Sequence, residues 1–175
     1  LRYFYIIFYL TTNIFGVYII EMNHIMPDII DFGINYVGEK KGTSYGNTNK
    51  QPKLCIFDKK YINEMILPYF LNIKENNDYK LYPFSVNKIY KLSIIKKYNI
   101  KFNEEFKMWE DKPFLIEVLN RANSIVFSDK YLYNYISRNG NYSLSGRYNP
   151  DEFKTILTSF KRYEELFGER YNFNS

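Results

Sequence analysis

Residues 109–127 read WEDKPFLIEVLNRANSIVF. Asp111 and Pro113 are typical of a helix N-terminus, because an Asp side chain can cap free backbone N–H groups and proline lacks the N–H that would go unpaired there. The apolar residues that follow have helical spacing up to Ala122, and Ser124–Phe127 then predicts a strand. A helix that leads directly into a strand indicates layered α/β structure.

The segments before this stretch continue the alternation of strands and helices. Tyr3–Leu10 and Asp28–Val37 are apolar and aromatic and predict buried strands, while Ile14–Met26 between them predicts a helix that ends at a proline. Residues 38–52 are polar and rich in glycine, so we expect a loop. Two amphipathic helices should follow, one from Asp58 to about Leu71 and one over Val86–Tyr98.

The C-terminal third predicts two short strands and a long helix. Ser124–Phe127 and Tyr131–Ile136 read as strands on either side of a turn at Asp129 and Lys130. Asn149-Pro150-Asp151 opens a terminal helix to about Phe167, where Gly168 is a typical stop.

Composition excludes several classes of site. The chain has 175 residues, which suits one domain, and its single Cys55 and single His24 exclude an internal disulfide and a zinc site of Cys and His ligands within the chain. The net charge of +5 is spread over isolated lysine pairs, so nucleic-acid binding through the 19 Tyr and 15 Phe ranks low. A compositional bias of the genome explains the aromatic content better than a binding platform does.

The first twenty residues are apolar but do not fit a membrane anchor well. Arg2, Thr11, Thr12, Asn13 and Gly16 interrupt the run, so a buried strand followed by a helix is favoured over a spanning helix or a signal peptide. The chain begins with Leu rather than Met, which favours a piece of a longer protein.

Glu110 and Asp111 are adjacent carboxylates at the expected start of the helix. A carboxylate can accept a proton from a hydroxyl group, and a neighbouring carboxylate raises its pKa. An acidic pair also stabilises a helix N-terminus through capping and the helix dipole, without any catalysis. The two residues alone leave both interpretations open.

Five segments, in this order, resemble the C-terminal half of a family 2 glycosyltransferase of the GT-A fold, a bacterial family that builds surface polysaccharides. They are Pro27–Gly33, Ser85–Lys91, Asn99–Glu104, Trp109–Phe114 and Tyr131–Tyr135. The resemblance treats residues 1–175 as a single partial domain, in which residues 9–148 match the family, residues 1–8 match poorly and residues 149–175 form a terminal helix and tail.

The resemblance implies a partial GT-A (Rossmann-like) α/β fold that lacks the N-terminal nucleotide-binding half. It implies the acceptor-side portion of an inverting glycosyltransferase, which moves a sugar from a nucleotide-sugar, typically a UDP-sugar, to a polysaccharide or lipid-linked glycan. The expected setting is cell-envelope biosynthesis in the bacterial cytoplasm, at the inner face of the membrane and in peripheral contact with it.

Residue by residue, the resemblance assigns a catalytic base to Asp111 and a tuning or orienting role to Glu110. It assigns substrate contacts to Trp109, Asn87, Lys88, Arg138 and Ser143, with Trp109 against a sugar ring and Arg138 against the donor diphosphate. The alternatives are an ordinary helix cap at Asn87, a solvated lysine at Lys88 and a surface-loop arginine at Arg138.

One departure from the family concerns the metal site. The family holds a divalent metal, Mn or Mg, with an Asp-x-Asp cluster, whereas this sequence has Tyr5, Ile6, Ile7 and Phe8 at those positions and no Asp or Glu before Glu21. We therefore expect no cofactor bound by this chain alone and no transfer activity in isolation. We also expect exposed apolar surface, and activity only with a complementing N-terminal half.

Two other function classes stay open. A non-catalytic glycan- or partner-binding remnant would keep glycan binding after the change Asp111→Asn. A nucleic-acid binder would show an affinity for single strands that falls steeply with salt.

Overall fold

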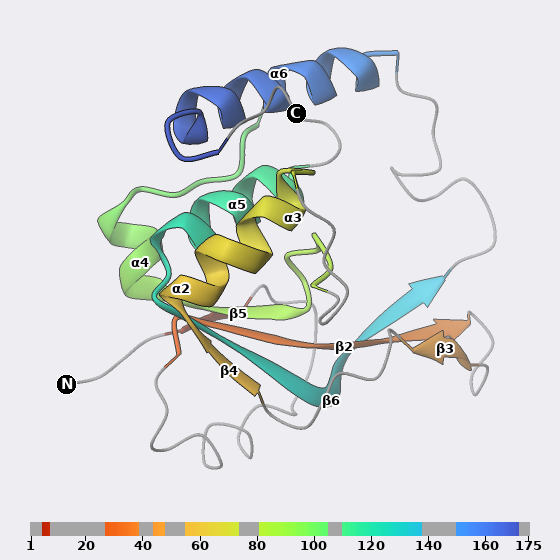
Figure 1. Ribbon diagram of the computed structural model, residues 1–175. Coiled ribbons are helices and arrows are strands. Elements are labelled where there is room, and N and C mark those ends of the chain that lie inside the picture. The colour runs from red at the N-terminus through yellow and green to blue at the C-terminus, as the bar shows by residue number, and fades with distance from the viewer. Residues whose placement is uncertain are drawn as a thin grey trace.

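The computed structural model describes residues 5–7, 27–38, 44–47, 55–73, 81–104, 110–137 and 150–171. Within these ranges the protein has a mixed α/β fold, with helices layered over one face of a sheet and the C-terminal helix lying on the far side of that helical layer (Figure 1). The α/β layering expected from the sequence is confirmed. Residues 1–4 and 8–26, which include the expected Ile14–Met26 helix, lie outside the described residues.

The sheet is built around one parallel pair of long strands. Strand β2 (Ile29–Gly38) runs parallel to β6 (Ser124–Ser137), and the remaining strands pair in antiparallel fashion. The order across the sheet is β1 (Tyr5–Ile7), β5 (Lys88–Lys91), β2, β6 and β4 (Cys55–Asp58), and β3 (Ser44–Asn47) pairs with β2 in addition. Strand β3 lies inside the stretch that the sequence predicted as a loop.

The helical layer starts where Asp58 caps a helix, as predicted. The Asp58 Oδ1 atom accepts a hydrogen bond of 2.9 Å from the backbone N–H of Tyr61. The helix continues to Phe70, close to the end expected at Leu71. Its parts are α2 (Lys59–Tyr61), a π-helical turn (Ile62–Ile66) and α3 (Leu67–Phe70).

The predicted helix over Val86–Tyr98 is wrong in its first half. Residues 88–91 form strand β5, and only Leu92–Lys97 form a helix, α4. Ile89 and Tyr90 pair with Ile30 and Ile29 of β2, and both side chains are buried. Pairing with an existing strand therefore overrides a helical spacing of apolar residues.

Helix α5 (Asp111–Arg121) lies at the centre of the core. Its first and last residues agree closely with those of the helix predicted from residues 109–127. Its apolar face contacts the sheet and α3, and the Phe114 ring packs edge-on against Tyr90 at a centroid distance of 5.3 Å. The buried residues of the helix are Phe114, Leu115, Ile116, Val118 and Leu119. The expected cap is wrong, because Glu110 occupies the N-cap position without a side-chain hydrogen bond and Asp111 lies in the first turn.

One further difference concerns the C-terminal third. Strand β6 is continuous from Ser124 to Ser137, so the expected turn at Asp129 is only an irregularity in its pairing with β2. Helix α6 (Glu152–Phe167) agrees with the prediction, and Gly168 follows it. Its inward face carries Thr155, Ser159, Tyr163 and Phe167, whereas Phe153, Ile156, Leu157 and Phe160 are exposed.

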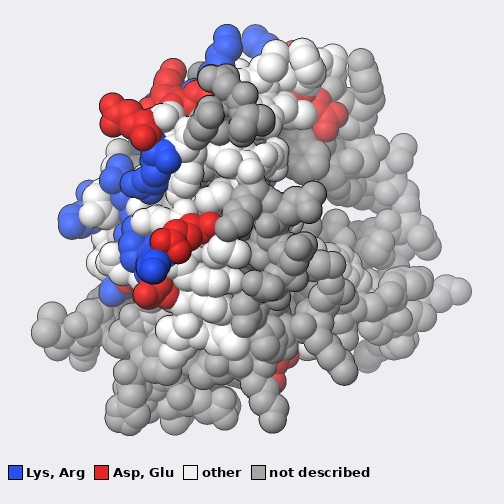
Figure 2. All heavy atoms as spheres, in the orientation of Figure 1, with Lys and Arg blue, Asp and Glu red and all other residues white. Residues whose placement is uncertain are grey.

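Among the described residues, the structure has no helix that is both long and apolar enough to span a bilayer. On the face that Figure 2 shows, the described Lys and Arg side chains lie next to Asp and Glu side chains, so positive charge is interleaved with negative charge there. This arrangement gives no support to a nucleic-acid interface on that face.

Candidate active site

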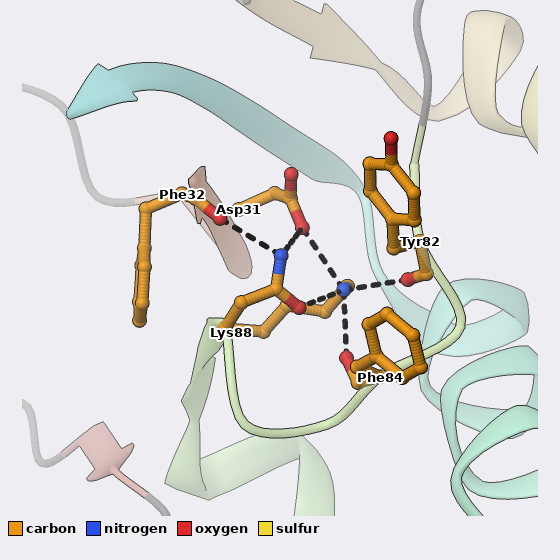
Figure 3. A network of polar contacts seen from close by, with 6 residues as sticks. Asp31, Phe32, Tyr82, Phe84 and Lys88 are labelled. Atoms are coloured by element: carbon orange, nitrogen blue, oxygen red, sulfur yellow. Dashed lines mark hydrogen bonds and ion pairs between the residues drawn. The ribbon is translucent and has the colours of Figure 1, made fainter. Parts of the chain in front are cut away.

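A polar network is buried where the loop before β5 meets β2 (Figure 3). Lys88 Nζ lies 2.9 Å from Asp31 Oδ1, and the two side chains are 0% and 1% exposed. The same ammonium group donates to the backbone carbonyl oxygens of Tyr82 (2.7 Å) and Phe84 (2.8 Å) and lies 2.7 Å from Asn87 Oδ1. Four oxygen atoms therefore surround Lys88 Nζ. An ammonium group has only three N–H donors, so each of its donors has an acceptor.

Asn87 completes the network from the other side. Its side-chain amide donates to Asp31 Oδ1 at 3.1 Å and to the Phe32 carbonyl oxygen at 2.8 Å, while the Phe32 N–H donates to the Asn87 carbonyl oxygen at 3.0 Å. The loop is therefore fastened to β2 by both main-chain and side-chain hydrogen bonds. Neither alternative from the sequence holds, because Lys88 is not solvated and Asn87 caps no helix.

Burial opposes charge on both members of the ion pair. It raises the pKa of Asp31 to about 6, although the nearby Lys88 ammonium group lowers it in part. Burial likewise lowers the pKa of Lys88, and the carboxylates of Asp31 and Asp111 counteract that effect. A lysine whose three protons all have acceptors stays charged, so the pair holds the loop as an ion pair at neutral pH.

Asp111, the predicted base, lies in the first turn of α5, the helix whose Phe114 ring packs against Tyr90 of β5. Its carboxylate is close enough to act electrostatically on Lys88, Tyr90 and Tyr133, since its charge raises the pKa of both tyrosines after the larger effect of burial. The side chain is half-buried in the first turn of α5, where the positive end of the helix dipole favours a carboxylate. The Asp111 carboxylate therefore acts electrostatically on the strand that carries Lys88, although 22 residues separate the two in the sequence.

The other predicted site residues divide into three groups. Glu110 is half-buried and directly precedes Asp111 at the helix N-cap. Trp109, Arg138 and Ser143 lie outside the described residues, so their predicted substrate contacts stay predictions. Asn87 and Lys88 are buried, and their polar atoms contact the protein itself.

Asp31 is the site residue that sequence reasoning missed. It occurs in the middle of an otherwise apolar strand, and a carboxylate at a buried strand position requires a partner of opposite charge. That signal was present in the sequence. The identity of the partner was not, because Lys88 lies 57 residues further along the chain and was assigned to a helix.

The described residues do not fit a divalent-metal site. They contain no group of three or more His, Cys, Asp or Glu side chains close enough together to hold an ion. The buried carboxylate of Asp31 is already paired with Lys88, so it does not offer the charge that a hard cation needs.

Comparison with known proteins gives a partial match. No family model matches the chain. A segment of 78 residues, 44% of this chain, is 35% identical to the poly(ribitol-phosphate) β-N-acetylglucosaminyltransferase TarS of Staphylococcus aureus strains Mu50 and MW2. The chain is related to a glycosyltransferase. The matched segment covers 14% of TarS, so the relationship concerns a small part of the relative.

A solved structure agrees with this relationship at the level of the fold. The structure of S. aureus TarS 1–349 in complex with UDP-GlcNAc superposes with a TM-score of 0.50 at 22% identity, over 81% of this chain and 35% of that chain. The structure of the same protein in complex with UDP gives a TM-score of 0.44 at 20% identity. The α/β fold is therefore part of a glycosyltransferase fold, and the chain spans about a third of the solved domain.

Proposed function

We propose that this chain is the acceptor-side, C-terminal half of an inverting family 2 glycosyltransferase. The observation that carries the proposal is the position of Asp111 in the first turn of α5, three residues before Phe114, whose ring packs against Tyr90 of the strand that carries Lys88, in a chain related to a glycosyltransferase. A half-buried carboxylate at a helix end can act as a general base.

The proposed reaction uses Asp111 to activate the acceptor. The Asp111 carboxylate takes the proton of an acceptor hydroxyl while that oxygen forms a bond to the anomeric carbon of the donor sugar. The bond from that carbon to the diphosphate oxygen breaks on the opposite face, and the nucleoside diphosphate leaves with the bonding electrons. Attack from the face opposite the leaving group inverts the anomeric configuration.

The remaining residues receive supporting roles. Glu110 orients or tunes Asp111, Trp109 packs against a sugar ring, and Arg138 and Ser143 contact the donor diphosphate. Asn87 and Lys88 act as positioning residues in place of direct substrate contacts, because their donors and acceptors are already used within the protein. They fix the loop that carries Tyr82 and Phe84.

The donor in this proposal is a UDP-sugar, in keeping with the complex of the solved relative with UDP-GlcNAc. The acceptor is a polysaccharide, a lipid-linked glycan or a polyol-phosphate polymer such as the one in the relative's name. A divalent Mn or Mg ion in the intact enzyme would offset the charge of the leaving diphosphate, and its ligands would come from outside the residues described here. The enzyme would work in the cytoplasm, at the inner face of the membrane.

The experiment compares two proteins. One is the 175-residue chain, and the other is the same chain extended by the residues that the gene region encodes immediately upstream of Leu1. UDP release is measured with a panel of UDP-sugars in the presence of Mn²⁺ or Mg²⁺. We expect release from the extended protein and none from the 175-residue chain.

Each other outcome contradicts part of the proposal. Release by the 175-residue chain would contradict its inactivity in isolation. If no upstream reading frame encodes a nucleotide-binding strand with an Asp-x-Asp cluster, the acceptor-half assignment fails and a glycan-binding remnant becomes the better assignment.

A further inference from the structure

Helix α6 lies on the outer side of the helical layer and is held to the protein at its C-terminal end (Figure 1). Tyr163 and Phe167 of this end are buried and belong to the core. Just beyond the helix, the Tyr171 hydroxyl donates a hydrogen bond of 2.7 Å to the backbone carbonyl oxygen of Asn63. These contacts fix the rotation of α6 about its own axis, and so they define which of its side chains face away from the protein.

The N-terminal half of α6 has its polarity reversed. The side chains that face the protein are the hydroxyls of Thr155 and Ser159, and both residues are buried. Large apolar side chains are exposed instead, and we call them the outer ridge: Phe153, Ile156, Leu157 and Phe160. Phe153 is 72% exposed, more than any other large apolar residue in the part of the chain that the structure describes. A helix that only had to pack on this protein would carry its apolar side chains inward.

The outer ridge is continuous along the helix. Phe153, Ile156 and Phe160 follow one another at spacings of three and four residues, so their side chains lie next to each other. The Phe160 ring in turn contacts the ring of the buried Tyr163 at a centroid distance of 6.2 Å. The ridge therefore runs from the exposed start of α6 to its anchored end. A contiguous apolar surface of this kind indicates a contact with another protein or with a membrane.

Two lysines border the outer ridge on the side opposite to the protein. Leu157 follows Lys154 by three residues and precedes Lys161 by four, so both lysines lie beside it. Both are exposed, and neither forms an ion pair with a residue that the structure describes.

The acidic residues of α6 lie outside this stretch. Residues 153–162 contain three basic residues and no acidic one. Glu152 is half-buried and three residues before Thr155, which places it on the inward side of the helix. Glu164 and Glu165 follow the last residue of the ridge, and Glu165 Oε2 lies 3.2 Å from Arg162 Nη1. The ridge is therefore an apolar surface with a positive border.

We propose that the outer ridge and its two lysines bind the surface of a bilayer that contains anionic phospholipid. Helix α6 lies in the plane of the bilayer, and the ridge enters the boundary between headgroups and acyl chains. The stems of Lys154 and Lys161 lie along this apolar surface while their ammonium groups reach the lipid phosphates. The inference goes beyond the proposed function, because it assigns a membrane-binding surface to α6 and needs no transfer activity.

The lysines favour a bilayer over a second copy of this chain. A pair of copies that buried this face would be two-fold symmetric, with the same surface of each copy in the contact. Two such helices run antiparallel, and the lysine border of one lies on the same side as that of the other. Lys154 and Lys161 of the two copies would then repel each other, whereas lipid phosphates attract them.

Co-sedimentation of the 175-residue chain with lipid vesicles tests the proposal. Vesicles of phosphatidylcholine alone are compared with vesicles that also contain about 25% phosphatidylglycerol, an anionic lipid. We expect a partition constant on the order of 10³ M⁻¹ or more on the anionic vesicles, and weaker binding to the neutral ones. Failure to bind the anionic vesicles at about 5 mM lipid would overturn the proposal.

A first pair of variants tests the apolar contact. The double change of Phe153→Gln and Leu157→Gln removes the two most exposed side chains of the ridge and should weaken binding to both kinds of vesicle about tenfold. The matched control changes Ile56→Gln and Ile136→Gln, which are similarly exposed (49% and 54%) but lie on β4 and β6. Thermal unfolding checks that each variant is folded. An equal loss in both variants would overturn the assignment to α6.

A second pair tests the charge. The double change of Lys154→Gln and Lys161→Gln should weaken binding to the anionic vesicles about tenfold and leave binding to the neutral ones unchanged. Lys101→Gln together with Lys130→Gln is the control, since it removes the same charge from exposed positions outside α6. If both variants lose binding equally, the net charge of the protein attracts the vesicles and the proposal fails.

Two further measurements separate this inference from its rivals. In a Phe153→Trp variant, lipids with brominated acyl chains should quench the added tryptophan, whereas in Ile56→Trp they should not. Sedimentation velocity reports on self-association, and a dimer that the Phe153→Gln and Leu157→Gln changes convert to a monomer, without vesicle binding, would show that a second copy covers the ridge. Asp111→Asn should bind vesicles as the unchanged protein does, so the inference and the proposed transfer reaction can fail independently.

Discussion

Lys88 Nζ and Asp31 Oδ1 lie 2.9 Å apart in a part of the protein that solvent does not reach. The pair connects β5 to β2 and, through the two carbonyl oxygens that Lys88 also binds, connects the loop of Tyr82 and Phe84 to the sheet. A buried ion pair adds little net stability compared with apolar residues, but it places its partners uniquely. Its main effect here is on the position of the loop that carries Tyr82 and Phe84.

Removal of one partner should be far more costly than removal of both. Lys88→Met leaves the Asp31 carboxylate buried without its cation, and we expect a loss of about 3–5 kcal/mol in the free energy of unfolding. The double change of Lys88→Met and Asp31→Asn should lose less than Lys88→Met alone, because no uncompensated charge stays buried. Urea unfolding of the four proteins measures the difference. Lys91→Met is a matched control, because Lys91 lies in the same strand and pairs with Asp28, but its side chain is 24% exposed and should matter less.

The pH dependence of stability should report on Asp31. Burial raises its pKa from 3.8 to about 6, so the folded protein binds a proton more readily than the unfolded chain in that range. The contribution of Asp31 to stability is therefore largest below about pH 4 and falls as the pH rises to about 6. Relative to Asp31→Asn, the unchanged protein should lose stability over this window, as chemical unfolding at several pH values would measure. A difference that rises over the same window would contradict the raised pKa.

Gly33 should not tolerate a side chain. A Cβ atom at this position would lie 2.4 Å from Cδ1 and 2.6 Å from Cε1 of the Tyr131 ring, which covers the strand there. Gly33→Ala must displace that ring, and we expect a loss of about 1–3 kcal/mol. In a Tyr131→Ala background the same change should cost much less, because the obstructing ring is gone. Thermal unfolding of the four proteins gives the coupling, and equal costs in both backgrounds would exclude the contact as the cause.

Local sequence signals correctly predicted the helices whose own caps, stop residues and apolar spacing favour them. Asp58 caps its helix, α5 follows its apolar spacing and α6 ends at Gly168. The errors lie where distant partners decide the structure. Lys88 lies in a segment with helical spacing of apolar residues, but it forms part of a strand because it pairs with β2 and forms an ion pair with Asp31. Residues 44–47 pair with β2 in spite of their loop-like composition. The contact between Tyr36 and Tyr135 was missed for the same reason, since the two residues meet only through sheet register.

Lys59 should act as a cap for the C-terminal end of α5. Its ammonium group donates to the carbonyl oxygens of Leu119 (3.3 Å) and Asn120 (2.7 Å), and burial together with Arg170 and Arg121 lowers its pKa to about 8. Lys59→Met should cost about 1 kcal/mol. Because the unfolded chain binds the proton more readily, the unchanged protein should gain stability relative to Lys59→Met as the pH rises from about 8 to 10.5. Guanidinium unfolding across this range measures the sign, and a decrease would contradict the lowered pKa.

Asp111 should be required for transfer and not for acceptor binding. In the chain extended at its N-terminus, Asp111→Asn keeps the size of the side chain but replaces one acceptor oxygen by an NH₂ donor and so removes the base, and we expect kcat to fall about 10²–10⁴-fold. Glu117→Gln is the matched control, since Glu117 is a half-buried carboxylate in the same helix, two turns further on, and should leave kcat within twofold. UDP release and acceptor binding are measured for both. If Asp111→Asn and Glu117→Gln lower kcat equally, the effect comes from the charge of α5, and another group accepts the proton.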